Sequence, residues 1–282
     1  MNDSVILITG GTNGIGKQAA FDLARMGGTI VITARDAAKG ARVVAELKTA
    51  SGNDQIDLIT GDLSRMADCV AVAKAFKARY SRLDVLLNNA GAIFDTQQKT
   101  ADGYEQTFAL NHLSYFLLAR ELMDVLKASA PARIVNVASG AHIGAKLNFD
   151  DLMNAQRYSS MRVYGQSKLA NIMFSYALAR RLAGTGVTTN ALHPGFVNTG
   201  FGHNGSALMR TVVGLMQRVM ALKPEQGAAT MVYLASSPEV AGKTGLYWEK
   251  CKPITSSAAS MVIDDQERLW MASEAFLAKV GV

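Results

Sequence analysis

A tyrosine and a lysine stand four residues apart, in the segment Tyr164-Gly165-Gln166-Ser167-Lys168. On a helix, residues four apart lie on the same face, so these two side chains would be neighbours. A free phenol has a pKa of about 10, which is too high for acid–base work at neutral pH. A nearby ammonium lowers that pKa because it favours the phenolate, and the tyrosine then becomes a usable acid or base. An ordinary helix face would show the same spacing and is the alternative.

Two further polar side chains could join this pair. Ser139 follows the apolar run 133–138 directly, at the end of a predicted strand, where its hydroxyl could hold a substrate oxygen. A turn serine before Gly140 is the alternative. Asn111 lies in a strongly apolar helical stretch, and a buried amide needs hydrogen-bond partners. A structural asparagine that is satisfied in the core would look the same.

A glycine-rich loop follows the first apolar run, 5–9, and a helical pattern follows the loop. Gly10, Gly14 and Gly16 let the backbone turn tightly and approach a phosphate, and the free N–H groups of the helix would face the anion. The spacing is Gly-x3-Gly-x-Gly, which differs from the common dinucleotide fingerprint and from a P-loop. Turns also need glycine, but the position between strand and helix favours nucleotide binding.

The second apolar run, 29–33, leads into Thr33-Ala34-Arg35-Asp36. An acidic residue at such a strand end binds an adenosine 2′-hydroxyl, whereas an arginine suits a 2′-phosphate. Arg35 comes first, and Asp36 is predicted to cap the next helix. The sequence therefore predicts NADP(H), with NAD(H) as the alternative. Lys17 could assist, or it could be an ordinary solvated lysine.

These residues would be positioned by alternating strands and helices. Strand-like runs cover 5–9, 29–33, 56–60, 85–88, 133–138 and 187–192, with a shorter one near 245–248. Helical patterns begin near 14, 37, 64, 104 and 163, and 264–279 resembles a final amphipathic helix. Apolar strands separated by helices predict an α/β fold of Rossmann type, with a doubly wound parallel sheet and helices on both faces.

No linker or repeat divides the chain, so residues 1–282 are predicted to form a single catalytic domain. The least regular stretch is 196–223, which is rich in glycine, methionine and leucine. It is predicted to cover the substrate; a helix packed on the core is the alternative.

Composition excludes several classes of protein. Of the 282 residues 49% are hydrophobic, which excludes a disordered chain, and two cysteines without metal-ligand spacing exclude a disulfide framework. No apolar run approaches the about 20 residues that span a bilayer, and no signal peptide is visible, so a cytoplasmic location is expected. The net charge of +6 suits an anionic cofactor, and the scattered basic residues argue against nucleic-acid binding.

Taken together, the motifs resemble those of the short-chain dehydrogenase/reductase family over nearly the whole chain. The segments that match are the TGxxxGIG turn at 9–16, Asp62-Leu63, the NNAG element at 88–91, and the PGxVxT segment at 194–199. Asn111, Ser139, Tyr164 and Lys168 match the family's catalytic tetrad in order and spacing. A narrower similarity, carried by segments such as Asn111-His112-Leu113 and Gln166-Ser167-Lys168-Leu169-Ala170-Asn171, is to the retinol dehydrogenase branch.

The resemblance implies roles for the tetrad. Ser139 would bind the substrate oxygen, Tyr164 would exchange a proton with it, Lys168 would lower the pKa of the tyrosine and bind the nicotinamide ribose, and Asn111 would position a water. With Arg35, the predicted cofactor site comprises Gly10, Thr12, Asn13, Gly14, Ile15, Gly16, Arg35, Asp62, Leu63, Asn89, Ala90, Gly91, Tyr164, Lys168, Pro194, Gly195, Val197 and Thr199. No metal is expected.

The predicted activity is an NADP(H)-dependent interconversion of a lipophilic aldehyde or ketone and its alcohol. A steroid or another small carbonyl is the alternative substrate, and a non-catalytic NADP-binding regulator is the alternative function. The intact tetrad argues against the regulator. Neither nucleic acid nor a membrane span is expected, and a homo-oligomer would be in keeping with the family.

Overall fold

The computed structural model describes residues 1–195 and 223–282, and the strands in this part form one sheet. Their order across the sheet is β3-β2-β1-β4-β5-β6-β7-β8. The bounds are β1 (Val5–Ile8), β2 (Thr29–Ala34), β3 (Ile56–Thr60), β4 (Val85–Asn88), β5 (Ala132–Val137), β6 (Val187–His193), β7 (Tyr247–Glu249) and β8 (Lys252–Ile254). Neighbours from β3 to β7 pair in parallel, and β8 pairs antiparallel with β7.

Side chains alternate between the two faces of each strand, and each face contributes to one of the two large cores. Ile6 and Ile8 of β1 pack with α1 (Gly14–Arg25), α2 (Ala37–Ser51) and α9 (Pro224–Ser236). Val5 and Leu7 face the other layer. The elements of that layer are α3 (Met66–Arg79), α4 (Gln106–Phe108), η1 (Ala109–Leu113), α5 (Ser114–Glu121), α6 (Met123–Ala128), α7 (Ser160–Arg181) and α10 (Ile263–Lys279).

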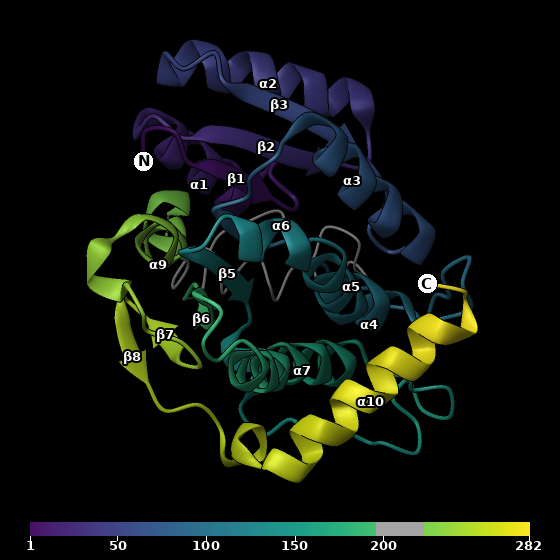
Figure 1. Cartoon of the computed structure of the whole chain (residues 1–282). Coiled ribbons are helices and arrows are strands. Elements are labelled where there is room, and N and C mark those ends of the chain that lie inside the picture. The colour runs from purple at the N-terminus through teal and green to yellow at the C-terminus, as the bar shows by residue number, and fades with distance from the viewer. Residues whose placement is uncertain (196–222) are drawn as a thin grey trace.

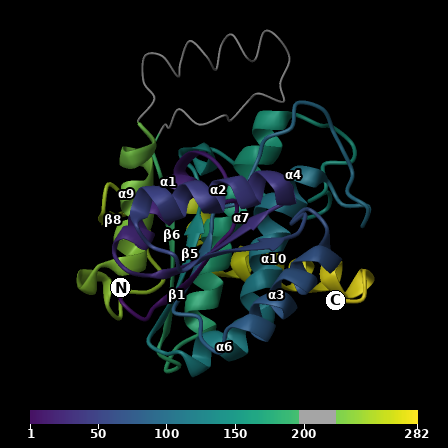
Figure 2. The same cartoon turned by 90° about the horizontal axis from the view of Figure 1, so that it is seen from above.

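The C-terminal helix α10 lies against α7, on the side away from the sheet (Figure 1). The two termini lie well apart from each other, both in Figure 1 and in the view from above in Figure 2. No helix in the described ranges is long and apolar enough to cross a membrane.

The strand order reverses beside β1, which pairs with β2 on one side and with β4 on the other. From β1 the chain runs outward to β3 and then returns to β4 on the opposite side. Such a switch point opens a crevice at the carboxyl ends of the strands, which is where doubly wound folds bind their ligands. The turn after β1 and the segment after β4 both lie at this crevice.

The predicted doubly wound fold is confirmed, and the bounds of β1 to β6 lie within one residue of the expected ones, with β3 and β4 identical to them. Among the described elements, strand β8 and helix α9 were not expected. Strand β8 has the sequence Lys-Pro-Ile, without an apolar pattern, and pairs through only one edge. Helix α9 begins at Pro224, after its N-cap Lys223. Residues 196–222 of the predicted substrate cover 196–223 lie outside the described part.

Candidate active site

The structure brings the four predicted catalytic residues together at the carboxyl end of β5. Ser139 follows that strand and its hydroxyl hydrogen-bonds Tyr164 of α7. Lys168 lies one turn further along α7, with its Nζ 5.7 Å from the centre of the Tyr164 ring. Asn111 in η1 donates a 3.0 Å hydrogen bond to Ser167, the residue next to Lys168. A serine, a phenol, an ammonium and an amide therefore share one site.

Lys168 is almost completely buried, with 3% of its surface exposed. Its Nζ donates a 3.0 Å hydrogen bond to the carbonyl oxygen of Val137, the last residue of β5. Burial disfavours the ammonium and lowers the pKa of Lys168 to about 7. The position of this side chain is therefore fixed by the sheet, and its charge changes near neutral pH.

Tyr164 behaves differently from the expectation that the lysine lowers its pKa. Burial raises the pKa of Tyr164 to about 12, and the hydrogen bond from Ser139 opposes this rise because it favours the phenolate. Burial is the larger of these two effects, and it also weakens the charge of Lys168, whose Nζ lies near the ring. In the protein alone Tyr164 is a neutral phenol at pH 7, which is the form that donates a proton.

Asn111 lies in a wide helical turn, the π-helical segment η1, and its amide group is fully engaged. Its Oδ1 accepts from the backbone N–H of Ala92 at 2.9 Å. Its Nδ2 donates to the carbonyl oxygen of Ala92 and to Ser167, both at 3.0 Å. The amide thus ties the segment after β4 to α7. Single-turn π-helices are frequent at functional sites.

Two histidines that were given no role in the sequence analysis fix the turn that carries Ser139. His142 Nε2 accepts from the backbone N–H of Ser257, so its proton is on Nδ1, which donates to the carbonyl oxygen of Ser139 at 2.8 Å. His193, at the end of β6, accepts a 3.1 Å hydrogen bond from the backbone N–H of Gly140. His193 and Gly140 are 53 residues apart in the sequence, and His142 and Ser257 are 115 apart. Only the fold reveals these two contacts.

The glycine-rich loop is shaped by close packing against the segment that follows β4. A side chain at Gly16 would place its Cβ 2.3 Å from Asn89 Nδ2, and one at Gly10 would place it 2.9 Å from the Cα of Ala90. Thr9 Oγ1 accepts from the backbone N–H groups of Asn89 and Ala90, at 2.8 and 2.9 Å. Glycine is therefore required here by contact as well as by the positive φ of Gly10.

The first turn of α1 meets the crevice with its N–H groups available. Asn13 is the N-cap of this helix, and its side chain makes no capping hydrogen bond. Thr12 and Ile15 beside it are half-buried, and Gly14 has a positive φ. Free N–H groups and the positive end of a helix dipole suit a phosphate. Gly91 keeps the space near Lys168 clear, because a Cβ there would lie 3.4 Å from Nζ. The residues present thus fit a dinucleotide.

Beyond the end of β2, Arg35 is exposed and Asp36 caps α2 as expected, since its carboxylate accepts a 2.9 Å hydrogen bond from the backbone N–H of Lys39. This bond lowers the pKa of Asp36. Lys17 forms a 2.6 Å ion pair with Glu46 of α2. Arg35 is therefore a basic residue at this strand end that takes part neither in the cap of α2 nor in the ion pair of Lys17.

The remaining predicted cofactor residues are only partly within the described part. Asp62 and Leu63 follow β3; the Asp62 carboxylate accepts from the backbone and hydroxyl of Ser64, and Leu63 is buried. Pro194 and Gly195 follow β6 at the same end of the sheet. Val197 and Thr199 lie outside the described residues.

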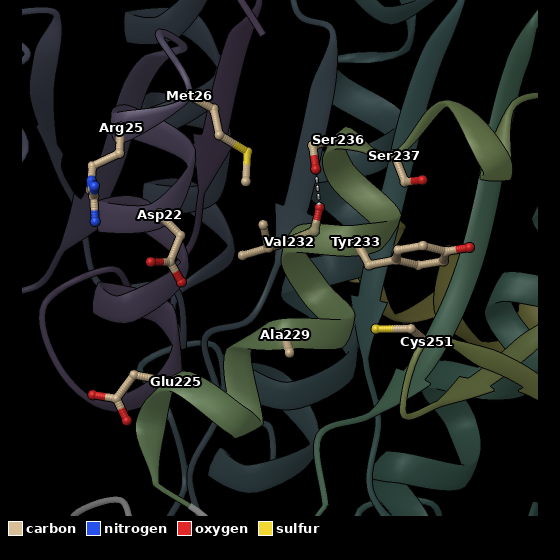
Figure 3. Close-up of a pocket in the computed structure, with 10 residues that line it drawn as sticks. All are labelled: Asp22, Arg25, Met26, Glu225, Ala229, Val232, Tyr233, Ser236, Ser237 and Cys251. Carbon is tan, nitrogen blue, oxygen red and sulfur yellow. Dashed lines mark hydrogen bonds between the residues drawn. The ribbon is translucent and has the colours of Figure 1, made fainter.

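A separate hollow of about 630 Å³ opens between α1 and α9 (Figure 3). Asp22 and Arg25 of α1 line one side, and Val232 and Tyr233 of α9 line the other. Burial raises the pKa of Asp22. None of the tetrad residues borders this hollow, so it is distinct from the reaction centre.

Comparison with known proteins gives a consistent result. Residues 4–208 match the family model for short chain dehydrogenase. The chain is 39% identical to retinol dehydrogenase 12 of Mus musculus, covering 95% of this chain and 84% of that protein. It is 37% identical to human retinol dehydrogenase 14 (97% and 86% covered) and 38% identical to human polyprenol dehydrogenase (96% and 84% covered).

Solved structures agree with the sequence relatives. An uncharacterized protein from Mycobacterium paratuberculosis superposes with a TM-score of 0.80 at 28% identity, covering 98% of this chain and 94% of that one. The NADP complex of Pseudomonas aeruginosa RhlG gives 0.71 at 29% identity, with 88% and 94% covered. The NADH complex of 3-ketoacyl-(acyl-carrier-protein) reductase from Brucella melitensis gives 0.67 at 25% identity, with 87% and 96% covered.

Fold, motif order and relatives thus agree, and the chain belongs to the short-chain dehydrogenase/reductase family, as an oxidoreductase that uses a nicotinamide cofactor.

Proposed function

We propose that the protein is an NADP(H)-dependent oxidoreductase that interconverts a lipophilic aldehyde or ketone and its alcohol. The observation that carries this proposal is the contact between Ser139 and Tyr164, with Lys168 one helical turn away at the carboxyl end of β5. Two hydroxyls at this point can both hydrogen-bond one substrate oxygen. We also propose that the chain acts as one catalytic domain and forms a homo-oligomer, and its cytoplasmic location stays a prediction.

In the direction of reduction, the protein has to hold the carbonyl oxygen and give it a proton. The bound nicotinamide supplies the hydride. Ser139 donates a hydrogen bond that polarises the carbonyl, and Tyr164, a neutral phenol at pH 7, transfers its proton to the oxygen as negative charge develops there. Lys168 stabilises the phenolate that remains, through its position beside the same ring. In oxidation the same groups act in reverse.

The proton transfer is tested by removing the Tyr164 hydroxyl. Tyr164→Phe should lose turnover by at least about 100-fold, because the general acid is gone, while NADPH still binds. Turnover is followed by NADPH absorbance with retinal, a polyprenal, steroids, aromatic aldehydes and quinones, and binding by NADPH fluorescence. A Tyr164→Phe protein with full activity would refute the assignment.

A lipophilic substrate is proposed because relatives with 37–39% identity are named for retinol and polyprenol, which are long apolar alcohols. The same panel of substrates tests this point. We expect kcat/KM for retinal or the polyprenal to exceed that for short, water-soluble aldehydes. The reverse order would leave the reaction class standing and overturn the lipophilic substrate.

The preference for NADP(H) is proposed from Arg35. Asp36 is engaged in capping α2 and Lys17 is paired with Glu46, which leaves Arg35 to meet a 2′-phosphate. Arg35→Asp should lower kcat/KM for NADPH and raise that for NADH, so that the ratio changes by at least about tenfold. Lys39→Asp, a charge reversal of the same size one turn into α2, is the matched control. An unchanged ratio in Arg35→Asp would show that another residue recognises the 2′-phosphate.

A further inference from the structure

Tyr115 of α5 is a tyrosine whose hydroxyl the fold does not use. The residue is completely buried, and its hydroxyl oxygen has no hydrogen-bond partner among the described residues. Buried polar groups are nearly always paired, since leaving one unpaired costs free energy. A phenylalanine would fill the same space in the apolar layer without this cost, so the hydroxyl calls for an explanation.

The hydroxyl belongs to the surroundings of Lys168. Lys168 Nζ lies 5.7 Å from the ring centre of Tyr115 and 5.7 Å from that of Tyr164, so two phenols flank one ammonium. Burial raises the pKa of Tyr115, and the charge of a Tyr164 phenolate raises it further. The ionisation of Tyr115 therefore depends on that of Tyr164, whose ring lies beside the same ammonium.

The polar groups beside Lys168 differ in how many of their hydrogen-bonding positions are already used. The ammonium has three hydrogens, and one is donated to Val137. The amide of Asn111 already makes three hydrogen bonds, to Ala92 and Ser167. Ser139 and Tyr164 hydrogen-bond each other, whereas the hydroxyl of Tyr115, the other ring beside this ammonium, has no partner in the described part of the site.

We propose that Tyr115 is a positioning residue that acts through Lys168: its hydroxyl and the Lys168 ammonium bind one water molecule together, and this water keeps the ammonium charged and oriented. A buried water needs at least two polar partners, and these two groups supply them. The inference rests on the proposed function, because Lys168 is taken there as the partner of the catalytic phenol.

The groups that face Lys168 make the pH dependence interpretable. Tyr164 on its own helix and Tyr115 on α5 can titrate, whereas Asn111 from η1 and the Val137 carbonyl from β5 cannot. Of the nearby histidines, His112 faces Asn171 and Ser273, and His142 faces Ser139 and Ser257. A change at Tyr115 should therefore be seen in the titration of the Lys168–Tyr164 pair.

The test is Tyr115→Phe, which keeps the ring and removes the oxygen. We expect kcat for carbonyl reduction to fall about tenfold while KM for NADPH stays within about twofold. The alkaline limb of the pH profile of kcat should move to lower pH, because the ammonium loses a stabilising partner and gives up its proton more easily.

Tyr104→Phe is the matched control. Tyr104 is also buried, but its hydroxyl donates to the carbonyl oxygen of Phe276 in α10, which is not a tetrad residue. The same atom is removed, so Tm should fall, while kcat and its pH profile should stay those of the wild type. If Tyr115→Phe also shows the wild-type kcat and pH profile, Tyr115 is only a core residue and the inference is overturned.

A binding measurement separates this inference from the proposed function. The pH at which NADPH affinity declines should move lower in Tyr115→Phe, and this readout needs no turnover. If the wild type binds NADPH but reduces none of the carbonyls, the proposed reaction fails, and the shift in binding alone supports or overturns the role of Tyr115.

Discussion

His112→Gln should change how the stability of the protein depends on pH. His112 lies in η1 next to Asn111 and is completely buried. Its Nε2 lies 3.0 Å from Ser273 Oγ of α10, and its Nδ1 lies 3.4 Å from Asn171 Oδ1 of α7. Burial lowers the pKa of His112 from 6.5 to about 4. Glutamine preserves polar contacts at this position and does not titrate.

The size of the effect follows from the two pKa values. Between pH 6.5 and about 4 the unfolded chain protonates His112 and the folded chain does not. The contribution to stability is therefore fully present above pH 6.5 and is lost as the pH falls toward 4. The loss amounts to about 2 kcal/mol at pH 5 and about 3 kcal/mol when it is complete.

The assay is thermal unfolding of both proteins from pH 8 to pH 5. The wild type is expected to be more stable at pH 8, and its advantage over His112→Gln should shrink by about 2 kcal/mol at pH 5, or about 4–8 °C in Tm. His142 and His193, whose pKa values are also lowered by burial, are present in both proteins and cancel in the difference. A difference that stays constant with pH would refute the buried, neutral state of His112.

Three further changes test the packing around the site. Gly16→Ala should weaken NADPH binding by at least about tenfold in a fluorescence titration. The new Cβ would lie 2.3 Å from Asn89 Nδ2 and 2.5 Å from the carbonyl oxygen of Gly10. Wild-type affinity would contradict the close packing of this loop against Asn89. Thr9→Val should destabilise the protein by about 2–4 kcal/mol and lower its Tm, because the N–H groups of Asn89 and Ala90 lose their acceptor. An unchanged Tm would mean that these N–H groups find another acceptor. His142→Phe should lower kcat by about tenfold without unfolding the protein, because the ring no longer links Ser139 to Ser257; an unaltered kcat would show that the turn holds Ser139 without it.

Much of the fold could be predicted because the strands carry a strong local signal. Strands β1 and β4 are buried along their whole length, so their apolar runs stand out in the sequence. The edge strand β8 lacks this signal, since all of its side chains are exposed and its pairing depends on β7. Where a strand is held by its neighbour rather than by burial of its own side chains, local pattern is not informative.

The meeting of Asn111, Ser139, Tyr164 and Lys168 in one site could be predicted from their order and spacing, whereas the electrostatics of the site could not. Two of the features used are local: Ser139 directly follows the predicted strand 133–138, and Tyr164 and Lys168 are four residues apart. Whether the pKa of Tyr164 rises or falls depends on burial by segments far away in the chain. The expectation that Lys168 lowers this pKa was therefore wrong for the protein without its cofactor. Tyr115 escaped notice because a tyrosine in an apolar helix is typical of a core residue.

The wide turn η1 also sets the rotational phase of the helix that follows it. An α-helix advances by about 100° and 1.5 Å for each residue, and a π-helical turn accommodates one residue more than a regular turn does. Removing one residue from 109–113 would let the helix run regularly, but it would rotate Tyr115 and the apolar face of α5 by about 100° relative to the segment before it. The extra residue therefore aligns two faces of one helix, the face that holds Asn111 against Ala92 and the face that packs beside Lys168.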